Sequence, residues 1–150
     1  MNTILTSDSP AATRRIGEAL AGQLLPGDII LLWGGMGAGK SELTRGIARG
    51  LGVQGYVPSP SFTILQVHDS GRLPLYHFDW YRLGSAEELY ELSMDEYLYS
   101  GGVSVVEWPG RAEEAVPEQY LRIELTPLSE TSRRLTLEPM GGFREIELQE

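Results

Sequence analysis

The segment 34–41, with the sequence GGMGAGKS, constrains the fold more than any other part of the chain. It matches the pattern G-x-x-x-x-G-K-[ST] at every fixed position. Glycines let backbone N–H groups converge on phosphate oxygens, because no Cβ stands in the way. The apolar run in 28–33 predicts a strand buried on both faces, and the leucine and isoleucine spacing over 41–51 predicts a helix. A strand, a phosphate-binding loop and a helix in this order predict an α/β fold of the P-loop NTPase type.

The single lysine of the chain lies inside this motif. Eleven of the 12 basic residues are arginines, and the remaining one is Lys40. An ammonium at this position reaches the β- and γ-phosphates of a nucleotide, and the hydroxyl of Ser41 is a ligand for Mg²⁺. The positive end of the helix that begins near Ser41 faces the same anion. The residues predicted to bind the nucleotide are Gly37, Ala38, Gly39, Lys40, Ser41 and Glu42.

The remaining elements follow from spacing and from turn residues. Ser9-Pro10 predicts the start of a helix over 10–25, and a turn at 69–71 joins predicted strands at 62–67 and 73–78. Ser85 and Ser93 each begin a capping-box pattern that predicts a short helix. Further strands are predicted at 103–106, 120–125, 133–138 and 143–148. Together they predict one domain, 1–150, with a mixed, largely parallel sheet flanked by helices and antiparallel strands towards the C-terminus.

Composition excludes several classes of protein. The chain has no cysteine and two histidines, which exclude cysteine-ligated metal centres and disfavour a histidine-rich one. A net charge of −9 disfavours tight unaided binding of DNA or RNA. The N-terminus lacks the features of a signal peptide, and the longest apolar run is far too short to span a membrane. We therefore expect a cytoplasmic protein that does not enter a membrane.

Two apolar runs each end in a carboxylate. Glu107 follows the predicted strand 103–106, where a Walker B acid would lie, and Asp79 ends the run LYHFD. A nucleotide-hydrolysing site needs carboxylates near its metal ion and its attacking water, so Asp79 and Glu107 are predicted catalytic residues and Glu107 a metal ligand beside Ser41. His77 is interpreted as a structural histidine. The loop 59–62, with the sequence SPSF, is either a rigid turn or a switch loop.

The nucleotide and the reaction are only partly defined by these residues. The guanine-reading pattern N-K-x-D needs a second lysine, which the chain lacks, so ATP is favoured over GTP. Nothing after Glu107 resembles an arginine-bearing lid over a second substrate. A small-molecule kinase and a nucleotide-gated binding module with negligible turnover stay open as alternatives to an ATPase.

Several motifs together resemble the TsaE family, formerly called YjeE, over about residues 13–125. They are GAGKS at 37–41, TRG at 44–46, SPSF at 59–62, YHFDWYRL at 76–83 and VEWP at 106–109. The resemblance implies a small bacterial P-loop ATPase needed for the threonylcarbamoyl (t6A) modification of adenosine 37 in tRNA. It implies ATP and Mg²⁺ as cofactors, the TsaB–TsaD complex as partner, and contact with tRNA only through that partner.

The resemblance also assigns roles to particular residues. Lys40 and its loop would bind the ATP phosphates, Ser41 and Glu107 would hold Mg²⁺, Asp79 would support hydrolysis, and 59–62 would act as a switch. The chain departs from the family pattern at 34–36, where it has Gly-Gly-Met in place of the usual Gly-Asp-Leu and so lacks the acidic residue, and at Ser41-Glu42, where Thr-Thr is commoner. Adenine contacts are expected from 6–13, and nothing is carried over to residues after Pro127.

Overall fold

A computed structural model describes residues 2–58 and 64–148. Within them, seven strands form one sheet. The strands are β1 (Thr3–Ser7), β2 (Ile29–Trp33), β3 (Leu65–His68), β4 (Leu75–Asp79), β5 (Val103–Glu107), β6 (Tyr120–Pro127) and β7 (Arg133–Met140). The helices are α1 (Pro10–Ala21), α2 (Lys40–Gly50) and α3 (Ala86–Glu91), with short 3₁₀ helices η1 (Met94–Tyr99), η2 (Pro109–Arg111) and η3 (Glu113–Ala115).

The sheet is parallel at its centre and antiparallel at its margins. Its order is β1-β7-β6-β2-β5-β4-β3. The pairs β4–β5, β5–β2 and β2–β6 are parallel, whereas β6–β7, β7–β1 and β3–β4 are antiparallel. The predicted mixed α/β fold, with antiparallel strands towards the C-terminus, is therefore confirmed. The carboxyl ends of the four central strands lie at the same edge of the sheet.

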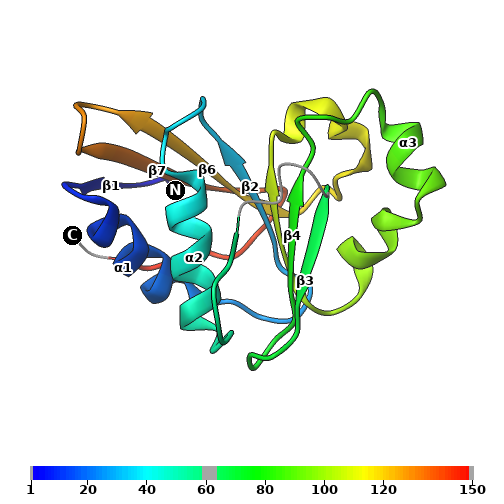
Figure 1. The fold of residues 1–150 in the computed structure, drawn as a ribbon, viewed down its shortest axis with the longest axis horizontal. Coiled ribbons are helices and arrows are strands. Elements are labelled where there is room, and N and C mark those ends of the chain that lie inside the picture. Colours follow the sequence, from blue (N-terminus) through cyan, green and yellow to red (C-terminus); the bar gives the residue numbers. More distant parts are fainter. Residues whose placement is uncertain (1, 59–63, 149–150) are drawn as a thin grey trace.

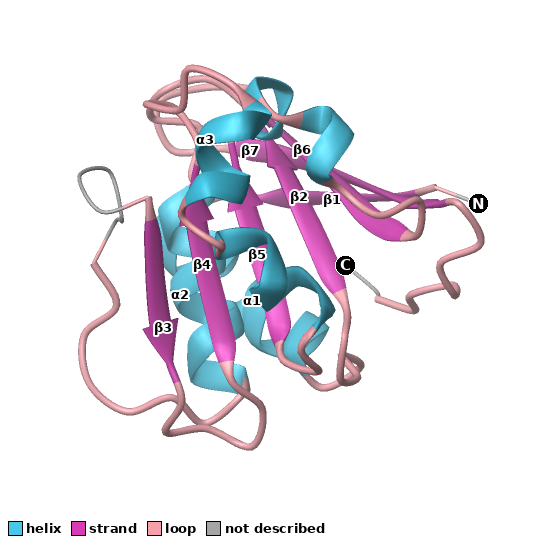
Figure 2. Cartoon of the chain, turned by 90° about the vertical axis from the view of Figure 1, so that its right-hand side faces the viewer, coloured by secondary structure: helices cyan, strands magenta, loops and turns pink. Residues whose placement is uncertain are grey.

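Helices cover both faces of the sheet, with α1 and α2 on one side and α3 with the 3₁₀ helices on the other (Figures 1 and 2). The apolar run of β2 explains this layering. Ile30 and Leu32 belong to the apolar cluster beneath α1 and α2, and Ile29 and Leu31 belong to the cluster beneath α3. Because alternate side chains of a strand point to opposite faces, a strand buried on both sides is apolar throughout.

Helices α1 and α2 pack in close contact because glycines line their interface. A Cβ on Gly46 would lie 2.1 Å from the backbone oxygen of Arg14, and one on Gly17 would lie 2.5 Å from that of Leu43. A side chain at either position would force the helices apart. This contact holds α1 against the helix that follows the glycine-rich loop.

The prediction of a strand over 143–148 is wrong. The edge of β7 that such a strand would need is taken by β1, which the sequence analysis did not predict. Phe143 and Ile146 instead pack into the core beside α1 and α2, without a ladder. Arg144 anchors the segment through hydrogen bonds of 2.9 and 2.5 Å to the two carboxylate oxygens of Asp28, and these bonds raise the pKa of the Arg144 guanidinium.

Some element boundaries also differ from the predictions. Helix α1 starts as expected, with the Ser9 hydroxyl accepting from the Ala12 N–H at 3.0 Å, but it ends at Ala21 rather than near residue 25. The two capping-box patterns form the predicted short helices, the first as α3 and the second as the 3₁₀ helix η1. The first residues of the predicted strand 62–67 lie outside the described part of the chain. Among the described residues, no helix is both long and apolar enough to cross a membrane.

Candidate functional site

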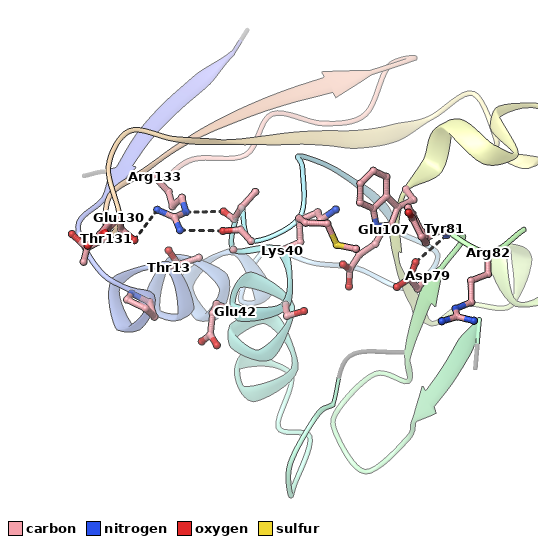
Figure 3. A pocket seen from close by; sticks show the side chains of 17 residues that line it. Thr13, Lys40, Glu42, Asp79, Tyr81, Arg82, Glu107, Glu130, Thr131 and Arg133 are labelled. Atoms are coloured by element: carbon pink, nitrogen blue, oxygen red, sulfur yellow. Dashed lines mark hydrogen bonds between the residues drawn. The ribbon is translucent and has the colours of Figure 1, made fainter. Parts of the chain in front are cut away.

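A cavity of about 550 Å³ opens at the edge of the sheet where the central parallel strands end (Figure 3). The glycine-rich loop and the start of α2 form its floor, from Met36 to Glu42. One end, here called the carboxylate end, is lined by Asp79, Tyr81, Arg82, Glu107 and Trp108. The opposite end, here called the turn end, is lined by Pro10, Thr13, Glu130, Thr131 and Arg133.

The floor of the cavity depends on glycines in backbone conformations that other residues rarely adopt. Gly37 and Gly39 have φ angles of 76° and 103°. Gly34 has φ 153°, and a Cβ there would lie 2.9 Å from the backbone oxygen of Leu125. The loop therefore takes a shape that only glycine allows at these positions, and it leads directly into the N-terminus of α2.

Lys40 is the first residue of α2, and its side chain crosses the cavity floor. Its Nζ donates to the Gly34 backbone oxygen at 2.7 Å and lies 3.8 Å from the ring centroid of Trp108. Burial lowers the pKa of the Lys40 ammonium, while the nearby Glu107 and Asp79 carboxylates oppose that shift by favouring the charged form. The cation predicted to bind phosphates is thus held inside the cavity.

The two predicted carboxylates lie side by side at the ends of β4 and β5. Asp79 and Glu107 are register partners in the parallel ladder, and both are buried. One Asp79 oxygen accepts from the Tyr81 N–H at 3.0 Å. Both carboxylates share the cavity with Lys40 and Ser41, so the structure brings together the residues predicted from separate motifs.

His77 contacts one of these carboxylates. Its Nε2 lies 2.6 Å from Glu107 Oε2, and both side chains are almost fully buried. The interpretation of His77 as a structural histidine agrees with this buried contact but did not identify Glu107 as its partner. Both residues lie on the face of the sheet that carries α1 and α2. His77 fixes one Glu107 oxygen, which restricts how the carboxylate can turn.

Glu42 is predicted to bind nucleotide, and it does line the cavity. Its carboxylate, however, is engaged by arginines: one oxygen pairs with Arg14 of α1, and the other accepts from Arg45 Nη1 at 2.8 Å. The backbone N–H groups of the first helical turn have no partner within a helix. The group that residue 42 presents to a ligand is therefore its backbone N–H rather than its side chain.

Two aromatic side chains form one wall of the carboxylate end. The rings of Tyr81 and Trp108 are 5.0 Å apart between centroids. Trp108 follows Glu107 directly and has a left-handed backbone conformation, with φ 58°. The switch loop proposed at 59–62 lies outside the described residues.

The turn end contains residues that the sequence analysis missed. Pro10 and Thr13 fall within the segment 6–13 expected to contact adenine, but Glu130, Thr131 and Arg133 lie in a region to which no role was given. No local sequence pattern marks these residues. In the structure β6 pairs in parallel with β2, which places the carboxyl end of β6 beside the glycine-rich loop. The turn between β6 and β7 therefore reaches the cavity.

The donor set at the carboxylate end suits Mg²⁺ bound together with phosphates. Among the described residues, no group of three His, Cys, Asp or Glu side chains is placed to hold a metal by itself. Mg²⁺ needs no such cage, because it commonly takes one or two protein oxygens and completes its shell with phosphates and water. Ser41 and Glu107 supply two oxygen-bearing side chains to the same cavity.

The fold and this cavity define an α/β protein of P-loop NTPase-like architecture. Residues 7–135 match the family described as "Threonylcarbamoyl adenosine biosynthesis protein TsaE". A protein of Bacillus subtilis named tRNA threonylcarbamoyladenosine biosynthesis protein TsaE is 38% identical over 142 residues, 95% of this chain and 89% of that protein. A Treponema pallidum protein of the same name is 39% identical over 87% of this chain and 96% of its own length.

The structural comparison agrees with the sequence comparison. The crystal structure of YdiB from Bacillus subtilis superposes with a TM-score of 0.82 at 34% sequence identity, covering 95% of this chain and 87% of that one. The chain belongs to the TsaE family.

Proposed function

We propose that this chain binds and hydrolyses ATP with Mg²⁺ and acts with the TsaB–TsaD complex in the t6A modification of tRNA. The observation that carries the proposal is the shared cavity of Lys40, Ser41, Asp79 and Glu107. A phosphate-binding loop alone could belong to a passive binding module. Two buried carboxylates at its far end supply the groups that hydrolysis requires.

Nucleotide binding divides between backbone and side chains. The backbone N–H groups of 37–42 would hold the phosphate oxygens, and the Lys40 ammonium would leave Gly34 and Trp108 to meet the β- and γ-phosphates. Ser41 and Glu107 would hold Mg²⁺, which when bound neutralises part of the phosphate charge. The residues of the turn end would then hold the adenosine, and those of the carboxylate end would meet the γ-phosphate.

Hydrolysis then depends on the two strand-end carboxylates. Asp79 would accept a hydrogen bond from the attacking water, and its bond from the Tyr81 N–H keeps one oxygen fixed. His77 would keep the Glu107 carboxylate oriented towards the metal site. The β4–β5 ladder fixes the backbone positions of Asp79 and Glu107, and therefore where their carboxylates can lie.

Two features of the chain, the lining of its cavity and its net charge, support a dependence on the TsaB–TsaD complex. Among the described residues, those that line the cavity include no evident second-substrate lid, and the net charge of −9 makes direct tRNA binding unfavourable. The tRNA would therefore be held by TsaB–TsaD in the cytoplasm, with ATP use by this chain supporting repeated turnover. We place the contact surface for TsaB–TsaD around Trp108 and the 59–62 loop.

The test is the affinity of TsaB–TsaD for this chain with ATP, with ADP and without nucleotide. The proposal predicts tightest binding with ATP, and by linkage the partner must tighten ATP binding by the same factor. It also predicts slow hydrolysis by the chain alone. Equal affinities in the three conditions would contradict a nucleotide-dependent partnership, and fast hydrolysis without partners would favour a different ATPase or a kinase.

A further inference from the structure

We propose that Arg133, which lies beside the turn between β6 and β7, is a positioning residue of the nucleotide site. Its side chain holds the glycine-rich loop in the shape that binds phosphates. The inference rests on the proposed function, because it concerns the same cavity. Arg133 lies after Pro127, in the part of the chain to which no sequence motif assigned a role.

The guanidinium of Arg133 joins two segments that are far apart in the sequence. Its Nε donates to the Ala38 backbone oxygen at 3.1 Å, and its Nη2 donates to the Gly37 oxygen at 3.0 Å (Figure 3). Its Nη1 donates at 2.9 Å to each of the Ser129 and Ser132 oxygens. One side chain thus fastens the β6–β7 turn to the glycine-rich loop, across 95 sequence positions in the case of Ala38.

Fixing these carbonyl groups also fixes backbone N–H groups. A peptide unit is planar and trans, so the N–H of the next residue points away from the carbonyl oxygen. The Ala38 oxygen turned towards Arg133 therefore directs the Gly39 N–H to the opposite side, away from the guanidinium. Gly37 and Gly39 have no side chain to restrain their dihedrals, so an external tether limits the conformations that this loop samples before a phosphate binds.

The arrangement depends on the shape of the arginine side chain. A guanidinium is planar and has five N–H donors in a fixed fork, so it can hold two successive carbonyl groups and the turn at once. A lysine keeps the positive charge but has a single nitrogen on a flexible stem, which cannot reproduce the fork. Arg133→Lys therefore removes the hydrogen bonds that tether the loop but keeps the positive charge.

The experiment is calorimetric titration of the full chain with ADP and, separately, with inorganic pyrophosphate, both in the presence of Mg²⁺. Arg133→Lys and Arg133→Gln are compared with the matched pair Arg134→Lys and Arg134→Gln. Arg134 is the next residue of β7 and is exposed, and no hydrogen bond of its side chain is found in the described ranges. Melting temperatures show that each variant is folded at the titration temperature.

Both Arg133 variants are expected to weaken ADP and pyrophosphate by about tenfold, the size of one or two lost charge-assisted hydrogen bonds. The Arg134 variants should stay within about twofold of the unmodified chain. Hydrogen–deuterium exchange of the ligand-free protein should rise over 34–40 in the Arg133 variants alone. A role confined to the stability of the hairpin would lower the melting temperature and leave both affinities unchanged.

Three results would overturn the inference while leaving the proposed function intact. Unchanged affinity in both Arg133 variants would show that the tether is not needed. Full affinity in Arg133→Lys with a loss in Arg133→Gln would show that the charge contacts the phosphates directly. A loss for ADP but not for pyrophosphate would place Arg133 at the nucleoside instead. If the unmodified chain bound neither ligand, the proposed function itself would fail.

Discussion

The two ends of the cavity are built in different ways. At the carboxylate end, Asp79 and Glu107 end adjacent parallel strands in the centre of the sheet, and both are buried. At the turn end, Glu130 and Thr131 are exposed residues of a hairpin turn, which the side chain of Arg133 fastens to the glycine-rich loop. Under the proposed function, the buried end would carry out the chemistry and the hairpin end would support binding.

The largest expected effect is on the rate of ATP hydrolysis, when carboxylates at the two ends of the cavity are replaced by amides. With TsaB–TsaD present, Glu107→Gln and Asp79→Asn should each lower the rate of ATP hydrolysis by about 100-fold, because each replaces a carboxylate with a neutral amide beside the metal or the attacking water. Glu130→Gln, at the other end of the same cavity, should stay within about twofold. Phosphate release measured for the three variants checks this, and equal losses in all three would remove the distinction.

The second effect concerns the packing of α2 against α1, the helix that contributes Pro10 and Thr13 to the turn end. Gly46→Ala should lower the free energy of unfolding by about 3 kcal/mol, because the new Cβ would collide with the Arg14 backbone and push α1 away from α2. Gly22→Ala is the matched control, since a Cβ there makes only an ordinary contact of 3.5 Å. Urea unfolding of both variants measures the difference. A Gly46→Ala protein as stable as the control would refute the close-contact interpretation.

A smaller effect is expected at Thr13, which lines the turn end. Its hydroxyl lies 2.6 Å from the Ser7 hydroxyl, and both groups are buried. Thr13→Val keeps the shape but removes this hydrogen bond and the one that the Thr13 hydroxyl donates to the Ser9 oxygen at 3.3 Å. It should therefore cost about 1 kcal/mol of stability and leave the rate of ATP hydrolysis unchanged. The exposed Thr131→Val should cost less than about 0.5 kcal/mol. A large loss of hydrolysis in Thr13→Val would show that the turn end takes part in the chemistry.

The carboxylate end was predictable because its signals are local. Glycine spacing and Lys40 define the loop, and an apolar strand ending in Glu107 or Asp79 places that carboxylate at the carboxyl edge of a parallel sheet. Since such strands end at one edge, separate motifs converge without further information. The pairing of His77 with Glu107 was harder to foresee, because it depends on which of the two strand faces each residue occupies.

The turn end was not predictable from local patterns, because its contacts are between distant segments. Arg133 reaches Gly37 across 96 positions, and nothing in the sequence of the turn marks that contact. The predictions at the edge of the sheet, where β1 was missed and a strand over 143–148 was expected, were wrong for a related reason. An alternating pattern over 143–148 suits a strand, but only the three-dimensional pairing shows that β1 already occupies the edge of β7.

Calorimetric titration of ATP and Mg²⁺ into the unmodified chain and into Lys40→Ala shows whether the glycine-rich loop and its lysine form a nucleotide site. Lys40→Ala should weaken ATP binding by about 3 kcal/mol, through loss of a charged contact to the phosphates. The variant should remain folded, because the ammonium faces the cavity. Equal ATP affinity in the two proteins, or no measurable binding by the unmodified chain, would show that this loop is not a nucleotide site.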